Sequence, residues 1–192
     1  MKKIITFLLL TIVLVSCGNT EISNNIKVNS IEELQNAIKD SKAGDNIVLA
    51  DGIYKDVEIE FYGKGTSNKP ITLKAETPGK VSIEGISNLK IGGDYLVAEG
   101  LHFKNGYTPS ENVIQFKIND TLIANHSIVT NCVIDAFTQP DRDVSDHLVK
   151  FWGRHNQLSN NYINRKIKFW SNGYGKNKWN PHVKNSHQIK NI

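Results

Sequence analysis

The feature that most constrains the fold of this chain is a repeat of about 30 residues. Four successive segments share an apolar position, and the spacings between its occurrences are 32, 29 and 31 residues. Two residues after it, each segment carries a polar side chain. A second strand-like pattern occurs at 114–117 and again 35 residues later, at 149–152. The apolar positions are Val97, Val129, Leu158 and Ile189, and the polar ones are Glu99, Asn131, Asn160 and Asn191.

A repeat built from short β-rich runs and turns, with no helix between them, predicts an all-β fold: a right-handed parallel β-helix, which is a single-stranded solenoid. Each repeat would form one coil, about 4.8 Å above the previous one. The asparagines of the polar position could then form a hydrogen-bonded ladder along the stack. The alternative, an antiparallel sandwich, would have hairpin turns every ~8–12 residues and no long period.

One short helix is expected before the first coil. Ser30 is a suitable N-cap, and Glu33 completes a capping box. Ile31, Leu34 and Ile38 provide an apolar face. We expect this helix to cap the N-terminal end of the β-helix, so that the first coil has no open edge.

The N-terminus has the pattern of a bacterial lipoprotein signal peptide. Lys2 and Lys3 precede an apolar run, Ile4–Val15, that is shorter than the about 20 residues of a membrane span. Because Ser16 and Cys17 follow as in a lipobox, we expect cleavage before Cys17 and lipidation of its thiol. The protein would then be an exported lipoprotein, bound to the membrane by this anchor, in the outer membrane, the periplasm or at the cell surface; a plain secretory signal is the alternative. The expected divisions are a signal peptide at 1–16, a polar tether at 17–27 and β-helix coils at 28–192.

Composition and charge exclude some classes of protein and favour one kind of partner. Two cysteines cannot form a disulfide-rich scaffold or a cysteine-rich metal site. The sequence has no phosphate-binding glycine loop and no nucleophile elbow. All 19 acidic residues lie at or before Asp146, and nine basic residues follow it. This asymmetry predicts a polyanionic partner; alternatively, sequence beyond this chain balances the charge.

The second strand pattern contains the candidate binding residues. Alternation along a strand directs Ile114, Phe116, Val149 and Phe151 inward and the residues between them outward. The outward side chains would form a basic row with an aromatic ring, in which cations meet sugar carboxylates and an indole meets a sugar ring. A solvated strand face is the alternative. The candidate substrate-binding residues are Lys117, Lys150, Trp152 and Arg154.

Other candidate sites are weaker. The loop 139–146 contains Asp141, Asp143 and Asp146 and could bind calcium through oxygen ligands. It lacks the glycine and the final glutamate of an EF-hand loop, so a solvated loop is favoured and we assign no metal ligands. His126 and His155 begin repeats and are expected to be turn residues. Cys132 is expected to be a small buried side chain.

Several motifs, in order and in register, carry a resemblance to a known family. They are Ala43–Asp56, Lys69–Ala75, Pro78–Val81 and Leu96–Phe103. Through them the chain resembles polysaccharide lyase family 6, the alginate lyases and chondroitinase B, from about Val28 to about Asn164. Members of this family are parallel β-helices, in agreement with the repeat.

The resemblance implies β-elimination on a uronate polymer. The polyanionic partner would then be an acidic polysaccharide, alginate or a glycosaminoglycan, and not a nucleic acid. In the family, calcium held by an asparagine and two glutamates neutralises the uronate carboxylate, a lysine removes the C5 proton and an arginine assists departure of the 4-linked oxygen. These residues follow a strand that corresponds to 187–191 here. We therefore expect the catalytic residues beyond Ile192 and no complete calcium site in this chain. Residues 164–181 depart from the family pattern.

Three hypotheses follow for the function. The first is the N-terminal, truncated part of a lyase that cleaves alginate, in particular poly-mannuronate, with dermatan or chondroitin as alternative substrates; this chain alone would be inactive. The second is a non-catalytic, surface-attached β-helix that binds polyuronate. The third is the product of a disrupted lyase gene.

Overall fold

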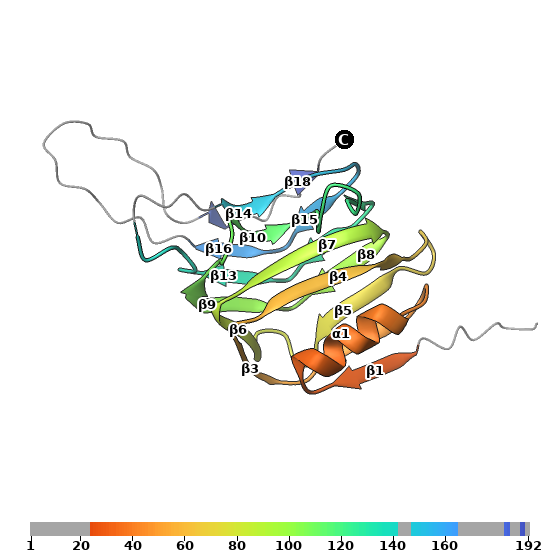
Figure 1. Ribbon diagram of the computed structural model, residues 1–192, viewed down its shortest axis with the longest axis horizontal. Helices are drawn as coiled ribbons and strands as arrows, with labels where there is room; N and C mark the ends of the chain where they lie inside the picture. Colours follow the sequence, from red (N-terminus) through yellow and green to blue (C-terminus); the bar gives the residue numbers. More distant parts are fainter. Residues whose placement is uncertain (1–23, 142–146, 165–182, 185–188, 191–192) are drawn as a thin grey trace, which may run out of the picture.

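The computed structural model describes residues 24–141, 147–164, 183–184 and 189–190 (Figure 1). The predicted signal peptide and the predicted lipidation site Cys17 therefore lie outside the described residues, as does most of the segment 164–181. Within the described part, no helix is long and apolar enough to cross a membrane.

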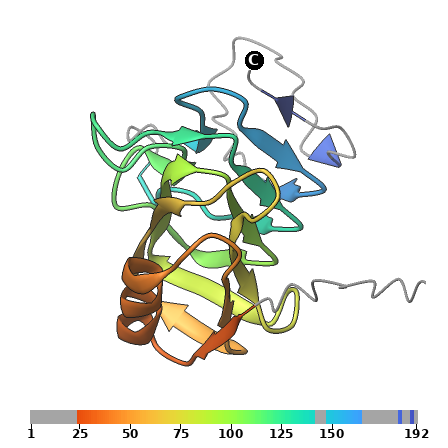
Figure 2. The same cartoon turned by 90° about the vertical axis from the view of Figure 1, so that its right-hand side faces the viewer.

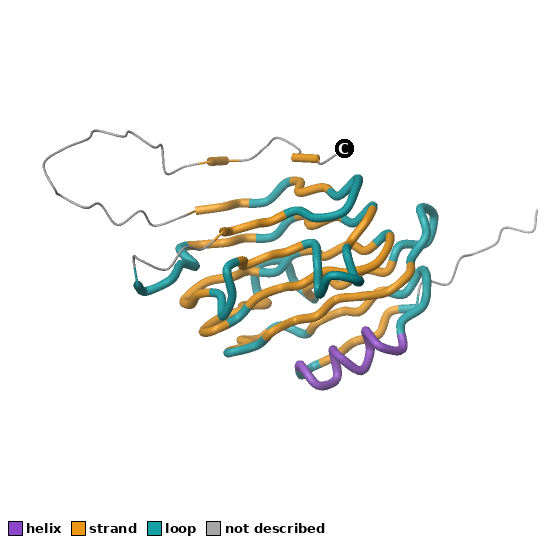
Figure 3. The backbone as a smooth tube through the Cα atoms, turned by 45° about the horizontal axis from the view of Figure 1, so that its top comes forward, coloured by secondary structure: helices purple, strands orange, loops and turns teal. Residues whose placement is uncertain are grey.

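The predicted parallel β-helix is confirmed, and its strands stack in three sheets (Figures 1 and 3). Sheet A has the order β1 (Asn25–Val28), β2 (Asn46–Leu49), β5 (Ile71–Ala75), β8 (Leu96–Glu99), β12 (Ile128–Thr130), β15 (Gln157–Ser159) and β18 (Ile189–Lys190). Sheet B has the order β3 (Gly52–Lys55), β6 (Val81–Ile86), β9 (His102–Tyr107), β13 (Val133–Asp135), β16 (Tyr162–Asn164) and β17 (Val183–Lys184). Sheet C contains β4 (Glu58–Lys64), β7 (Asn88–Asp94), β10 (Asn112–Gln115), β11 (Ala124–Asn125) and β14 (His147–Lys150).

The last two strands differ from the predicted coil. Ile189 pairs with Leu158, as the repeat predicts, but β18 runs antiparallel to β15. β17 likewise runs antiparallel to β16. β17 and β18 therefore run opposite to the strands beside them. They follow residues 164–181, where the sequence departs from the family pattern.

The capping helix is confirmed as α1 (Ile31–Asp40), at the end of the stack (Figure 2). The Ser30 side chain accepts a hydrogen bond from the Glu33 backbone N–H at 3.1 Å. Leu34 and Ile38 are fully buried, because their spacing places both on one face of the helix. α1 therefore closes the N-terminal end of the core, as expected.

The predicted apolar column is correct except at its first member. Val129 pairs with Leu158 on one side and with Ala98 on the other. Ala98 is fully buried, whereas Val97 is half-buried and pairs with Ile128. A slip of one residue moves a side chain to the opposite face of a strand, so the placement of Val97 in the core column was wrong.

The polar column does not provide the expected asparagine ladder. Asn131 and Asn160 occupy corners with φ of 53° and 55°, and Gly100 has φ of 77° one coil below. These are left-handed conformations, which glycine and asparagine adopt more easily than other residues. The Asn131 side-chain amide donates to Glu99 at 2.9 Å. The column therefore marks where each coil turns from sheet A toward sheet B.

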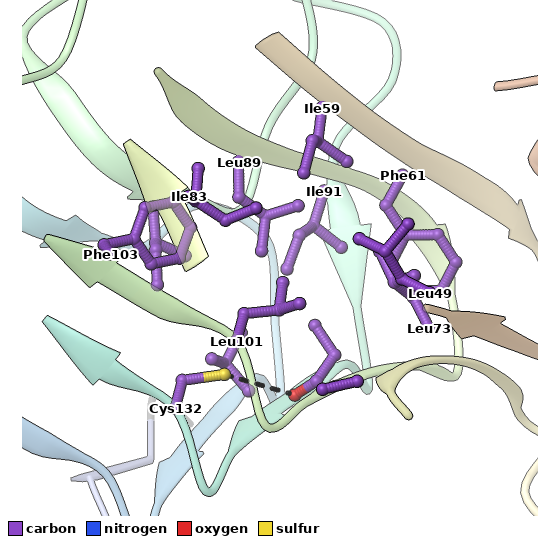
Figure 4. Packing of buried hydrophobic residues seen from close by; sticks show 14 of the residues in the cluster. Leu49, Ile59, Phe61, Leu73, Ile83, Leu89, Ile91, Leu101, Phe103 and Cys132 are labelled. Atoms are coloured by element: carbon purple, nitrogen blue, oxygen red, sulfur yellow. Dashed lines mark hydrogen bonds between the residues drawn. The ribbon is translucent and has the colours of Figure 1, made fainter. Parts of the chain in front are cut away.

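The core fills the space between the three sheets. In Figure 4, Leu49 and Leu73 of sheet A, Phe61 of sheet C and Phe103 of sheet B point into one interior. Cys132 lies at its edge, is 1% exposed and donates weakly to the Ala98 carbonyl. Burial raises the pKa of its thiol to about 12. Cys132 is therefore a small buried core residue, as expected.

Candidate functional site

The candidate site lies on the outer face of sheet C, near the end of the stack opposite α1. Ile114 pairs with Val149 and Gln115 with Lys150, so the two copies of the second strand pattern are stacked in register. Beneath this face, the Phe116 ring stacks on the Phe151 ring, with centroids 4.7 Å apart. The predicted alternation is therefore present, with the aromatic rings inside and the basic residues outside.

Lys117, Lys150 and Trp152 come together on this face, and we call them the basic–aromatic cluster. The Lys150 Nζ lies 4.9 Å from the centroid of the Trp152 ring, and the Lys117 Nζ lies 5.4 Å from it. Both distances are within the range of a cation–π interaction. The lysines come from neighbouring coils, so the cluster exists only because the repeat stacks residues 35 positions apart.

Each lysine of the cluster also pairs with a carboxylate. The Lys117 Nζ lies 2.5 Å from an Asp120 carboxylate oxygen, and the Lys150 Nζ lies 3.9 Å from one of Glu111. The hydrogen bond and the charge of Lys117 hold the pKa of Asp120 below its usual range. Sequence reasoning missed both carboxylates, because neither belongs to the repeated strand pattern.

A third lysine extends the basic face down the stack. Lys90 pairs in register with Gln115 above it and with Glu60 below it. Its Nζ contacts Glu58 at 2.8 Å and Glu60 at 3.8 Å, and the hydrogen bond from Lys90 lowers the pKa of Glu58. Sequence reasoning missed Lys90, although the alternation Leu89-Lys90-Ile91 resembles that of 114–117.

Arg154, the fourth predicted binding residue, lies at the corner after sheet C. Its backbone N–H donates to the Asn125 side chain at 3.1 Å, and its carbonyl accepts from the His126 N–H at 2.9 Å. Its side chain is exposed. The structure thus fixes the backbone of Arg154 beside the basic–aromatic cluster, two residues past Trp152.

A buried asparagine holds the backbone of this corner. Asn156 is fully buried, and its side-chain amide donates to the carbonyls of Trp152 at 2.7 Å and of Ala124 at 2.8 Å. Its side-chain oxygen accepts from the Ser127 N–H at 2.9 Å. Asn156 therefore positions Trp152 through its main chain. Sequence reasoning missed it because asparagine is expected in exposed turns.

The histidines that begin repeats are corner residues, as predicted. Tyr95, His126 and His155 have φ of 53°, 51° and 58°. Their rings stack in order along one corner, with centroids 4.7 Å apart at each step. This stack connects successive coils where sheet C turns into sheet A.

Metal-binding side chains do not form a cluster in the part of the chain that the structure describes. Among residues 24–141 and the shorter described segments, no three histidine, cysteine, aspartate or glutamate side chains gather where they could hold a metal ion. Of the acidic loop that could bind calcium, Asp143 and Asp146 lie outside the described residues.

Comparison with known protein families finds one matching family. The family model for chondroitinase B matches residues 28–192. No curated protein matches the chain significantly.

Solved structures of family 6 polysaccharide lyases are similar to the chain. The family 6 alginate lyase AlyGC is 45% identical, with a TM-score of 0.71 over 72% of this chain and 19% of its own. A mannuronic acid-specific family 6 lyase from the human gut microbiota is 32% identical, with a TM-score of 0.67 over 74% of this chain and 34% of its own. A family 6 lyase from Pseudopedobacter saltans is 35% identical, with a TM-score of 0.61 over 72% and 30%. The chain thus spans about a fifth to a third of the length of these relatives.

Proposed function

This chain belongs to the chondroitinase B family of polysaccharide lyases, and we propose that it forms the first coils of a lyase that cleaves a uronate polymer by β-elimination. The observation that carries the proposal is the basic–aromatic cluster on sheet C, in a chain that is 45% identical to an alginate lyase over the matched region. Mannuronate-rich alginate is the proposed polymer, since one relative is described as specific for mannuronic acid. Dermatan and chondroitin are the alternatives.

The chemistry of the sheet C face suits a polymer with one carboxylate per sugar. Lys90 and Lys150 flank Gln115 in successive coils, and neighbouring parallel strands are about 4.8 Å apart. This gives a row of cations and an amide donor along the stack. Lysine binds carboxylates as a point charge, and the Trp152 indole offers an apolar surface to a sugar ring.

We propose that these residues bind and orient the polymer, and that the proton transfers of β-elimination take place elsewhere in the complete enzyme. The match with this chain covers only 19% of AlyGC and 34% of the mannuronic acid-specific lyase, which leaves most of each relative outside the matched region. On this proposal, the 192 residues by themselves bind polymer without cleaving it. The same binding surface would serve a non-catalytic, surface-attached β-helix, which is the second candidate.

We also propose that the protein is exported and lipid-anchored through Cys17. The proposal is supported by the basic, then apolar, then Ser16-Cys17 order of the N-terminus. Anchoring by one modified cysteine would leave the β-helix outside the membrane, where a polymeric substrate can reach sheet C.

Substitutions in the cluster test the proposed binding. Lys150→Ala and Trp152→Ala should each weaken the affinity for oligomannuronate by roughly three- to ten-fold, since such contacts contribute on the order of 1 kcal/mol each. The affinity is measured by titration calorimetry on the purified protein, after thermal melting has established that each variant is folded.

Lys104→Ala is the matched control, because Lys104 is also a half-exposed lysine in an ion pair, with Glu84 at 3.9 Å, but lies on sheet B. It should bind oligomannuronate like the unmodified protein. Equal losses in Lys104→Ala and Lys150→Ala, or full affinity in Trp152→Ala, would contradict a binding surface on sheet C.

A further inference from the structure

The two carboxylates paired with the basic–aromatic cluster stand farther out in solvent than the lysines they contact. The Asp120 side chain is 93% exposed and that of Lys117 25%. The Glu111 side chain is 72% exposed and that of Lys150 41%. Each carboxylate is therefore the more accessible member of its ion pair, and a polymer would approach the pair from solvent.

The position of Asp120 is set by a turn that several hydrogen bonds hold. The Asn119 side-chain oxygen accepts hydrogen bonds from the backbone N–H groups of Thr121 and Leu122 at 3.0 and 2.8 Å. The Ile118 N–H donates to the Leu122 carbonyl at 2.9 Å, which closes the turn. Asp120 lies at its tip, three residues from the lysine that it contacts. The fold thus presents this carboxylate to Lys117.

The two lysine ammonium groups also lie against the Trp152 indole. Both lysine ammonium groups lie within 5.4 Å of the Trp152 ring centroid while they contact Asp120 and Glu111. A sugar ring that stacks on a face of the indole covered by an ammonium group must displace that group. A uronate can supply a new carboxylate to the displaced lysine, whereas a neutral sugar cannot.

We propose that Asp120, and more weakly Glu111, are built-in competitors for the uronate carboxylates of the polymer. The inference rests on the proposed function of the basic–aromatic cluster. Each carboxylate occupies a cation in the free protein and leaves it when a substrate carboxylate takes its place. The two residues therefore lower the affinity and make it depend on a negatively charged sugar, so that they are specificity-determining residues of this surface.

Asp120→Asn should bind oligomannuronate about two- to five-fold more tightly than the unmodified protein. The gain is small because an exposed ion pair, such as that of Asp120 with Lys117, contributes little in water. Glu111→Gln should give a smaller gain, because its pair with Lys150 is longer, at 3.9 Å against 2.5 Å. Dissociation constants are measured by titration calorimetry at one fixed salt concentration.

The control is Glu32→Gln, which makes the same charge change at an exposed position on α1, at the other end of the stack. It should bind like the unmodified protein. A gain in Asp120→Asn no larger than that in Glu32→Gln, while Trp152→Ala still weakens binding, overturns the competitor role and leaves the proposed function standing. If neither Trp152→Ala nor Lys150→Ala weakens binding, the proposed function fails, and the competitor role fails with it.

Discussion

Asn156→Ala is expected to lower the free energy of unfolding by roughly 3–5 kcal/mol. The side chain is fully buried and serves three backbone groups, those of Ser127, Ala124 and Trp152. Each buried group left without a partner costs about 1–3 kcal/mol, and a water molecule in the vacated space can recover part of this. Chemical denaturation measures the loss. Because Asn156 holds the Trp152 carbonyl, the variant should also bind oligomannuronate less tightly.

Asn160→Ala is the control for Asn156→Ala, because it replaces an asparagine that is exposed. Asn160 is exposed and has φ of 55°. Asparagine tolerates this left-handed conformation better than alanine does, so the substitution should cost only part of the strain of a left-handed residue, which is about 1–2 kcal/mol. If Asn156→Ala is no more destabilising than Asn160→Ala, the corner hydrogen bonds do not have the structural role assigned to them.

Gly93→Ala should destabilise the protein by at least about 3 kcal/mol. Gly93 has φ of 120°, and a Cβ atom there would lie 2.0 Å from the Gly63 carbonyl oxygen of the coil below. Backbone strain of this kind costs about 1–3 kcal/mol. The clash adds to it, because the contacted atom is backbone and cannot rotate away. The measurement is the free energy of unfolding in denaturant.

Gly79→Ala is the control that has the backbone strain of Gly93→Ala without its steric clash. Gly79 also has a positive φ, 82°, but no atom lies within 4 Å of the position of its Cβ. Alanine there should cost about 1–2 kcal/mol. Equal losses for the two glycine variants would show that the close approach of coils at Gly93 is not what requires glycine.

The sequence predicts the coil and the cap but misplaces parts of the register. The capping box at Ser30 and the alternation at 114–117 are local patterns, and the structure contains both. The alignment of the repeats places Val97 in the core column, yet Ala98 is the residue that pairs with Val129. A strand with apolar residues on both faces gives no signal to distinguish a slip of one position.

The part of the candidate site that belongs to the repeated strand pattern could be predicted from the sequence. Lys117, Lys150 and Trp152 belong to a repeated pattern, and stacking that pattern brings them together. Asp120 and Glu111 belong to turns, whose side chains follow no period. Their contacts with the lysines depend on how each turn folds back over sheet C, which the spacing of residues does not specify.

Amide hydrogen exchange with and without oligomannuronate is the most direct test of whether a uronate polymer binds along sheet C. Exchange should slow on binding in residues 112–122 and 147–154 and should not change in β13 and β16 of sheet B. Protection on sheet B, or no protection on sheet C at saturating oligomannuronate, would contradict it.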